Sequence, residues 1–427
     1  MATLKLGEDF LLGTATSSVQ IEGGDTNNTW YKWCEEGHIK DFSSAYTACD
    51  HWNRVEEDTE ILKSLGVQTH RLSLEWSRIQ PAPGEFSTEA TKHYREELEL
   101  LLANNIQPLV TLHHFSEPLW FQELGGWLKP ENSEYYVEYA RYVVENFGDL
   151  VAEWVTFNEP NVFVNFGYLI GIFPPGEKGL RKYFRVSAEI IKTHIRVYRL
   201  IHKIRSHRGF QGETRVGTAM HHRVFDGLTF VGKRTAELTD YFFHDLFLEG
   251  MIRGKFKFPL GLAGGKDEPG HYADFLGINY YTRNIVEFVL NPFCYFHRCR
   301  FDSNMDKSDL GWDIYPKGIY RVCKKYFLKY QLPIYITENG ISDQADKKRA
   351  KFIVDHLAYL VKAIGENIPV QRYYHWTVMD NFEWLEGEAG FFGLYHCDFR
   401  TQRRTPRESA KIYARICKDK EHVLPTL

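Results

Sequence analysis

Eight short β-rich runs alternate with eight longer helical patterns from one end of the chain to the other. The short runs are rich in β-branched and aromatic residues, whereas the longer segments repeat apolar residues at helical spacing. Such alternation is typical of parallel strands that are joined by covering helices. The expected strands are Phe10–Thr16, Thr69–Leu74, Gln107–His113, Glu153–Asn158, Arg215–Met220, Asp274–Asn279, Pro333–Glu338 and Arg372–Thr377.

The expected helices fill the gaps between these strands. The first carries a stop signal, Gly66, and Pro316 and Pro406 stand at first-turn positions of two others. The helices are Trp52–Leu65, Thr88–Asn104, Glu131–Asn146, Leu180–His207, Lys233–Glu249, Pro316–Tyr330, Asp346–Gly365 and Pro406–Lys418. Because no break in composition divides the chain, the pattern predicts the α/β class and a single (β/α)8 TIM barrel over residues 1–427.

A doubly wound open sheet is the alternative arrangement of alternating strands and helices. Its first strand usually leads into a glycine-rich phosphate turn. Here the first strand leads into TATSSVQIEGG, which contains no GxGxxG. The barrel is therefore favoured, with the irregular stretches Gly23–Asp50, Pro259–Tyr272 and Val289–Tyr315 as long loops of the kind that often carry function.

Charge and composition argue against several classes of partner. Lys and Arg total 52 against 56 Asp and Glu, a net charge of −4, so neither nucleic acid nor an acidic membrane is an expected partner. No apolar run approaches the ~18 residues of a membrane helix. The seven cysteines are odd in number and scattered, which is typical of free thiols, and MATLKLGEDF lacks a signal-like apolar stretch. These features predict a cytoplasmic protein.

Polar and aromatic residues gather at the predicted strand ends, where a barrel builds its active site. Two carboxylates stand out, since Glu159 follows the fourth strand and Glu338 ends the seventh. These strands are three steps apart around eight, so their ends face each other across the barrel mouth. Two opposed carboxylates suit glycoside hydrolysis, in which one protonates the leaving oxygen while the other attacks the anomeric carbon or activates water. The alternative is a pair of solvated glutamates, or a salt bridge to Arg71.

A catalytic metal is the competing use of the same rim. The pairs His113-His114 and His221-His222 are adjacent and form neither HxH nor HExxH. Cys294 and Cys299 lack a second pair at zinc spacing. We therefore expect neither metal nor cofactor, and keep a metal-dependent barrel hydrolase and a non-catalytic carbohydrate-binding barrel as the alternatives.

The chain resembles family 1 glycoside hydrolases, of the β-glucosidase and β-galactosidase type, over nearly its whole length. TFNEP around Glu159 resembles the family's acid/base motif, and ITENG around Glu338 resembles its nucleophile motif. NFEW at 381–384, GINYYT at 277–282, HRLSLEWSRI around Arg71 and LGW at 310–312 match in the same order. The resemblance implies a retaining mechanism and substrates that are neutral β-glucosides, β-galactosides or β-fucosides.

The resemblance also implies roles for individual residues. Arg71, Asn279 and Tyr281 would surround the nucleophile, and Trp376 would lie beneath the sugar ring. Trp384 would contact the outer hydroxyls, Trp312 would line the leaving-group side, and Phe392 would lie near the sugar. The residues expected to hydrogen-bond the sugar hydroxyls are Gln20, His114, Asn158 and Glu383.

Electrostatics predicts different proton affinities for the two glutamates. Arg71, Asn279 and Tyr281 should lower the pKa of Glu338, whereas the charge of Glu338 should raise the pKa of Glu159 to roughly 6–7. Glu159 argues against a thioglucosidase, which would carry Gln there, and the anion Glu383 argues against a 6-phosphoglycosidase. Phe115, Ser116 and Asn161 depart from the family pattern near the site.

Overall fold

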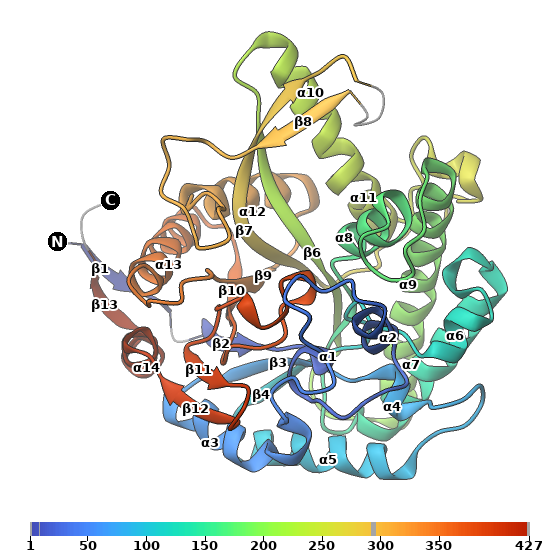
Figure 1. The fold of residues 1–427 in the computed structure, drawn as a ribbon, viewed down its shortest axis with the longest axis horizontal. Coiled ribbons are helices and arrows are strands. Elements are labelled where there is room, and N and C mark those ends of the chain that lie inside the picture. Colours follow the sequence, from blue (N-terminus) through green and yellow to red (C-terminus); the bar gives the residue numbers. More distant parts are fainter. Residues whose placement is uncertain (1, 8, 292–295, 425–427) are drawn as a thin grey trace.

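The computed structural model describes residues 2–7, 9–291 and 296–424 and contains a closed parallel barrel (Figure 1). Neighbouring strands pair in parallel around the barrel, and it closes where the sixth and seventh strands of the chain, β6 and β7, pair with each other. The barrel strands are β2 (Leu11–Ala15), β3 (Thr69–Ser73), β4 (Gln107–Thr111), β5 (Glu153–Asn158), β6 (Arg215–Asp226), β7 (Phe275–Phe288), β9 (Ile334–Asn339) and β10 (Val370–Trp376). The eight predicted strands and the (β/α)8 barrel are confirmed.

Long helices connect the strands and surround the barrel (Figure 1). The predicted segment Lys233–Glu249 differs from a single helix, because a π-helical turn at Tyr241–Asp245 separates α10 from α11. The helices are α3 (Val55–Leu65), α5 (Thr88–Ala103), α7 (Ser133–Phe147), α9 (Leu180–Arg208), α10 (Phe230–Asp240), α11 (Leu246–Arg253), α12 (Lys317–Tyr330), α13 (Arg349–Gly365) and α14 (Glu408–Asp419). Shorter helices lie in the loops: α1 (Ser18–Ile21), α2 (Thr29–Glu35), α4 (Trp76–Ile79), α6 (Leu119–Glu123) and α8 (Pro160–Val164).

Local sequence explains where these helices begin and end. The Ser87 side chain accepts a hydrogen bond from the Ala90 N–H and caps α5. Gly66 ends α3 with a φ of 70°, a left-handed conformation that glycine adopts without penalty. None of the described helices is long and apolar enough to cross a membrane.

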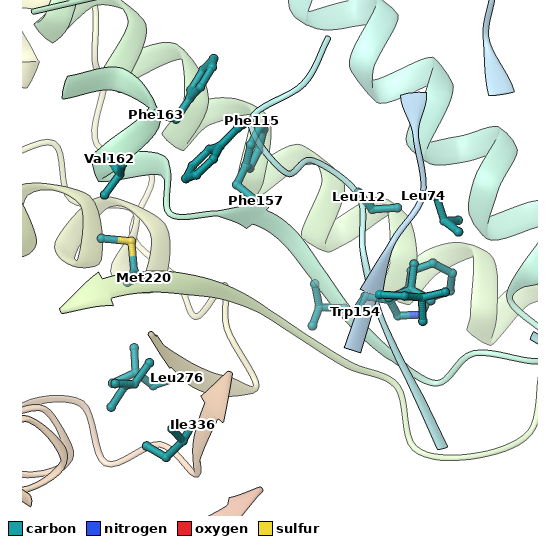
Figure 2. Close-up of a cluster of buried hydrophobic side chains, with 14 of the residues drawn as sticks. Leu74, Leu112, Phe115, Trp154, Phe157, Val162, Phe163, Met220, Leu276 and Ile336 are labelled. Atoms are coloured by element: carbon teal, nitrogen blue, oxygen red, sulfur yellow. The ribbon is translucent and has the colours of Figure 1, made fainter. Parts of the chain in front are cut away.

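The main hydrophobic core lies between the barrel and its helices. Figure 2 shows part of it, including Trp154 and Phe157 from β5 and Ile336 from β9, all of which are fully buried. A second cluster fills the barrel interior, where Leu109 and Val155 are also fully buried. These two packed layers fix the strand ends on which the site is built.

The strands β6 and β7 are longer than predicted and continue beyond the barrel as an arm (Figure 1). The strand β8 (His297–Arg300) pairs antiparallel with the outer half of β7, and α10 packs against it. Part of the predicted loop Val289–Tyr315 is therefore a strand, and its residues 292–295, with Cys294, lie outside the described residues.

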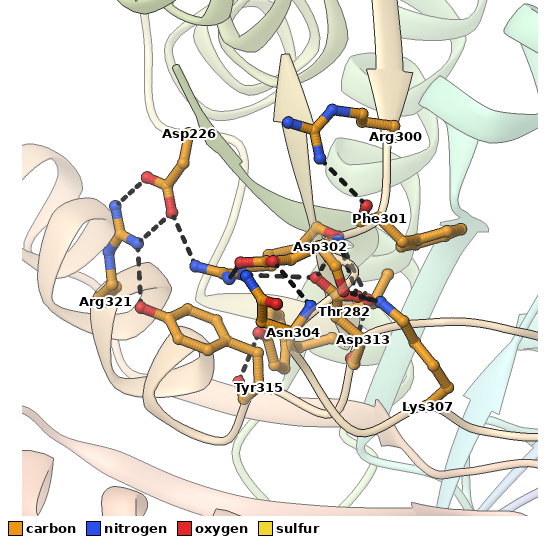
Figure 3. Close-up of polar contacts among 12 residues, drawn as sticks. Asp226, Thr282, Arg300, Phe301, Asp302, Asn304, Lys307, Asp313, Tyr315 and Arg321 are labelled. Carbon is orange, nitrogen blue, oxygen red and sulfur yellow. Dashed lines mark hydrogen bonds and ion pairs between the residues drawn. The ribbon is translucent and has the colours of Figure 1, made fainter. Parts of the chain in front are cut away.

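Polar contacts fasten the base of the arm to the chain that follows it (Figure 3). Arg321 donates to both oxygens of Asp226, at 2.9 and 2.8 Å. Arg283 donates to Asp302 at 2.6 Å, and the buried carboxylate of Asp313 accepts from Lys307 and from the Asp302 N–H. This network fixes the segment that carries Trp312.

Two further strand pairs lie outside the barrel. The strands β1 (Ala2–Lys5) and β13 (Glu421–Leu424) pair antiparallel and bring the two ends of the described chain side by side (Figure 1). The strands β11 (Tyr395–Asp398) and β12 (Arg403–Pro406) form a second antiparallel pair.

Candidate active site

A cavity of about 480 Å³ opens at the carboxyl ends of the barrel strands. Most of the predicted site residues line it, and Gln20, Arg71 and Asn279 lie behind this lining. The predicted residues at its surface are His114, Asn158, Glu159, Tyr281, Trp312, Glu338, Trp376, Glu383, Trp384 and Phe392. The structure thus brings together side chains from all parts of the chain.

Glu159 occupies a strained turn between β5 and α8. Its φ and ψ are 42° and 53°, a left-handed conformation that costs a non-glycine residue of order 1–3 kcal/mol. Its N–H donates to the Ala219 carbonyl at 2.6 Å, and Pro160 begins α8 directly after it. This turn directs the carboxylate into the cavity rather than along the strand.

Glu338 accepts hydrogen bonds on both carboxylate oxygens. Arg71 donates to Oε1 at 2.6 Å, and the Tyr281 hydroxyl donates to Oε2 at 2.5 Å. Burial raises the pKa of Glu338 to about 7, although Arg71 and Tyr281 act in the opposite direction. Arg71 and Tyr281 lower this pKa as predicted, but the expected net lowering is wrong, because the loss of hydration outweighs the two donors.

Glu159 accepts both of its hydrogen bonds on one oxygen. His221 Nδ1 lies 2.8 Å and Asn279 Nδ2 lies 2.9 Å from Oε1. Burial raises the pKa of Glu159 to about 7, and the Asn279 hydrogen bond opposes this rise. The raised pKa agrees with the prediction, but its main cause is burial rather than the charge of Glu338.

A short chain of hydrogen bonds links the two glutamates. Arg71 contacts Glu338 and also donates to Asn158 Oδ1 at 2.6 Å, and the Asn279 amide donates to the same Asn158 oxygen at 3.0 Å and to Glu159. Asn279, which was expected beside Glu338, is its strand partner in the pairing of β7 with β9, and its amide donates to Glu159.

Four polar side chains form or back one wall of the site, called here the polar wall: Gln20, His114, Asn158 and Glu383. The Gln20 amide donates to the Phe382 carbonyl and to Glu383 Oε2, at 2.9 and 3.3 Å. Asn158 Nδ2 donates to His114 Nε2 at 2.9 Å. Within the described residues, Gln20 Oε1 and His114 Nδ1 are buried without a partner. One unused acceptor and one unused donor suit a hydroxylated ligand.

Glu383 belongs to the same wall and is electrostatically unusual. Burial and the charge of Glu338 raise the pKa of Glu383 to about 8, against hydrogen bonds from Trp376 and Gln20. The group therefore offers both a donor and an acceptor near neutral pH.

Aromatic rings form the remaining walls. Trp376 and Trp384 both stack near His114, with ring centroids 5.9 and 5.8 Å from it. On the other side, Trp312 lies 6.0 Å from Phe392 and 5.8 Å from Tyr281. Flat rings beside unpaired polar atoms are the surfaces that a sugar needs.

Several cavity residues were not predicted. Arg223 lies beyond the expected end of its strand, and His221 was considered only as a metal ligand. Phe166 and Phe173 come from the α8 region and widen the apolar side of the mouth. Of the departures from the family pattern, Phe115 packs 5.1 Å from Trp384 and Ser116 donates to the buried Glu75 at 2.9 Å. The expected functional loop Pro259–Tyr272 contributes nothing to the cavity lining.

The histidine pairs do not come together as a metal centre. His113 contacts Glu117 at 3.1 Å, away from the His221–Glu159 contact. Across the described part of the chain, no group of three or more His, Cys, Asp or Glu side chains is placed to hold a metal ion.

Comparison with known proteins agrees with this geometry. A family model described as glycosyl hydrolase family 1 matches residues 2–422. Beta-glucosidase A of Thermotoga maritima is 32% identical, covering 98% of this chain and 99% of that protein. The beta-galactosidase of Saccharolobus solfataricus is 29% identical, covering 95% of this chain and 94% of its own.

Solved structures give the same result. A beta-glycosidase from Pyrococcus horikoshii superposes with a TM-score of 0.90 at 38% identity, covering 98% of this chain and 96% of its own. A beta-glucosidase from Thermotoga maritima in complex with deoxynojirimycin has a TM-score of 0.87 at 30% identity, covering 97% and 99%. With the family model spanning nearly every residue, the chain belongs to glycosyl hydrolase family 1.

Proposed function

We propose that this chain hydrolyses β-linked neutral glycosides with Glu338 as the nucleophile and Glu159 as the acid/base. One observation carries the assignment of roles. Both oxygens of Glu338 accept hydrogen bonds, one of them from the cation Arg71, whereas Glu159 accepts only from neutral donors and only on Oε1. A proton shared between the two carboxylates therefore resides on Glu159, and Glu338 is left ionised.

The first step forms a bond between Glu338 and the anomeric carbon as the bond from that carbon to the leaving oxygen breaks. Glu159 gives its proton to the leaving oxygen, so that an alcohol departs. Arg71 and Tyr281 donate hydrogen bonds that hold the attacking carboxylate in place. They can donate to the same oxygens again when the carboxylate is released in the second step.

The second step reverses these roles. The glycosyl ester carries no charge on Glu338, so Glu159 ionises more readily and takes a proton from water. The water oxygen attacks the anomeric carbon, and Glu338 leaves as the carboxylate. Two displacements at one carbon give overall retention of the β-configuration.

The polar wall is proposed to bind the hydroxyls of the sugar and so to select it. Gln20, His114, Asn158 and Glu383 would bind its hydroxyls, Trp376 would lie beneath its ring, and Trp384 would contact its outer hydroxyls. Trp312 would line the leaving-group side, and Phe392 would lie near the sugar. The names of the relatives, beta-glucosidase and beta-galactosidase, support glucose and galactose, and fucose fits the same neutral wall. None of these four hydroxyl-binding side chains is a cation that could pair with a 6-phosphate.

The proposed function is tested with nitrophenyl glycosides and with two variants. We expect hydrolysis of the β-glucoside and β-galactoside, and a much lower kcat/KM on 6-phosphoglycosides and on α-anomers. Glu338→Ala should lose activity on every substrate, and added azide should yield the α-azide. Glu159→Ala should retain glycosylation by 2,4-dinitrophenyl glycosides, and azide should yield the β-azide. NMR of the products decides: the opposite stereochemistry would reverse the two roles.

A cytoplasmic location is also proposed. Within the described residues, Cys34, Cys49, Cys299, Cys323, Cys397 and Cys417 form no disulfide. Free thiols are typical of a reducing compartment. Fractionation of cells that express the tagged protein would test the location.

A further inference from the structure

Two cavity residues next to Glu159 have no role in the proposed reaction steps. They are His221 and Arg223, both from the part of β6 where the barrel becomes the arm. Arg223 Nε donates to His221 Nε2 at 2.9 Å, and His221 Nδ1 lies 2.8 Å from Glu159 Oε1. The three side chains thus form a line that ends on the carboxyl group.

The order of donors along this line fixes the tautomer of the histidine. A guanidinium can only donate, so His221 Nε2 must be the unprotonated ring nitrogen. A neutral ring then carries its proton on Nδ1 and donates it to Glu159 Oε1. Burial holds the pKa of His221 well below its usual range, and Arg223 and His244 act in the same direction.

The histidine is itself held on two sides. Asn161, on α8 just after Glu159, donates to the His221 carbonyl at 2.9 Å and accepts from the His221 N–H at 3.3 Å. The ring stacks on Tyr281, with centroids 5.9 Å apart. Arg223 is fixed in turn by Asn284, whose side-chain oxygen accepts from it at 3.1 Å. The ring therefore has little freedom to rotate away from Glu159.

We propose that His221, oriented by Arg223, is a positioning residue that makes Oε2 of Glu159 the oxygen that carries the transferable proton. Oε1 already accepts from His221 and Asn279, so a proton on Oε1 would displace at least one of these two donors. In the first step the Oε2 proton passes to the leaving oxygen, and in the second Oε2 takes one proton from water. His221 remains neutral throughout. This inference rests on the proposed role of Glu159.

The test compares His221→Ala with His221→Asn, whose amide can place a donor near the position of Nδ1. We expect kcat/KM of His221→Ala to fall about 10–100-fold on phenyl β-glucoside, a part of the 10²–10⁴ that general acid catalysis supplies, and less than about 3-fold on the 2,4-dinitrophenyl glycoside. The reason is that only the poor leaving group needs a well-placed proton. His221→Asn should recover most of the loss. If His221→Ala does not fold, His221→Gln takes its place in the comparison. The glutamine amide lies one bond further from the backbone than Nδ1 of the histidine, so it should not replace the lost hydrogen bond to Glu159.

The pH profile gives a readout that a merely structural role would not move. The charged and titratable groups around Glu159 are Arg71, His221, Arg223, Tyr281, Glu338 and Glu383. A donor to a carboxylate favours its ionised form, so removing His221 should raise the pKa of Glu159. The basic limb of kcat/KM should then move to higher pH in His221→Ala and return in His221→Asn.

His222→Ala is the matched control, because it makes the same change as His221→Ala at the next buried position on the opposite face of β6. The inference would be overturned if His221→Ala lost equally on both substrates, if its basic limb did not move, or if His222→Ala showed the same leaving-group dependence. Glu159→Ala, measured in parallel, separates the two proposals. If Glu159→Ala shows no leaving-group dependence, the proposed acid/base role of Glu159 is wrong. If Glu159→Ala shows this dependence and His221→Ala does not, only the proposed positioning role of His221 is wrong.

Discussion

Tyr281 illustrates how one hydroxyl can set the behaviour of a buried carboxylate. It donates to Glu338 Oε2 at 2.5 Å, while Arg71 holds the other oxygen. Burial has already raised the pKa of Glu338 to about 7, so the two donors decide whether this proposed nucleophile is ionised at neutral pH. Hydrogen bonds to charged groups contribute about 1.5–3 kcal/mol, more than a neutral pair does.

Tyr281→Phe should therefore move the acid limb of kcat/KM to higher pH by about one unit, since one unit corresponds to about 1.4 kcal/mol. The sign follows from the lost donor: the carboxylate is less stabilised, its pKa rises, and protonated Glu338 cannot attack. Activity at pH 6 should fall more than activity at pH 8. Tyr280→Phe is the control, because that hydroxyl donates to the Tyr315 carbonyl at 2.8 Å instead. An unchanged acid limb in Tyr281→Phe would contradict the prediction.

At the scale of elements, the arm formed by β6, β7 and β8 supplies much of the side of the cavity that is proposed to receive the leaving group. β6 carries His221 and Arg223, β7 carries Tyr281, and the segment after β8 carries Trp312. Figure 3 shows that this last segment is held through Asp313, the neighbour of Trp312. The Asp313 side chain is buried and contacts Lys307 and Arg283, so its loss would remove a carboxylate from both cations, of which Arg283 keeps Asp302.

Asp313→Ala should loosen the wall that carries Trp312. Removing one partner of a buried ion pair costs about 3–5 kcal/mol, and here the cost falls on one segment. We expect KM to rise about 5-fold or more for aryl glycosides, and to change little for methyl β-glucoside, whose leaving group does not reach the wall. Steady-state kinetics on both substrates check this prediction.

Glu287→Gln provides the control for the arm as a whole. Glu287 pairs with Arg298 and Arg300 on the outer half of the same strands, where ion pairs are worth little. Its KM values should match those of the parent protein. An equal rise in KM on the methyl and aryl glycosides of Asp313→Ala would show that the network does not act through the wall.

At the scale of the whole molecule, buried acids couple folding to pH. Burial, together with the charges of Asp25 and Glu22, raises the pKa of Glu75 to about 7. Ser18, Ser77 and Ser116 surround its carboxyl group at 2.8–2.9 Å. Because the folded pKa exceeds the ordinary value of 4.5, the folded state binds the proton more tightly than the unfolded chain. The stability that this proton provides is present at low pH and is lost as the pH rises through 7.

Glu75→Gln should remove this dependence, since the amide imitates the neutral acid at every pH. The free energy of unfolding should fall from pH 5.5 to pH 8 by about 2 kcal/mol less in the variant than in the parent protein, because about 1.5 pH units separate pH 5.5 from the folded pKa of about 7. Guanidinium unfolding at the two pH values measures the difference. Glu123→Gln, at an exposed position of α6, should leave the dependence as it is. Identical pH dependence in Glu75→Gln and the parent protein would contradict the account.

The sequence predicted the barrel because each strand and helix has its own periodicity, and it predicted Glu159 and Glu338 because both stand where a β-rich run stops. The arm was missed because β6 and β7 stabilise each other beyond the barrel, through pairs such as Phe225 with Asn284. That gain depends on a partner far along the chain rather than on local pattern. The hydrogen bond from Asn279 to Glu159 was missed for a similar reason, since it depends on which side chains the closed barrel brings together and not on local pattern.

The pairing of β1 with β13 makes the chain suitable for circular permutation. Ala2 lies opposite Leu424, and β2 pairs with β10 to close the barrel, so the molecule is nearly a continuous ring. A short linker could join the two strands of this pair into a hairpin. New chain ends could then be opened in Pro259–Tyr272, which follows α11 and takes no part in the cavity lining. A circularly permuted protein of this design would keep every strand end that carries the site.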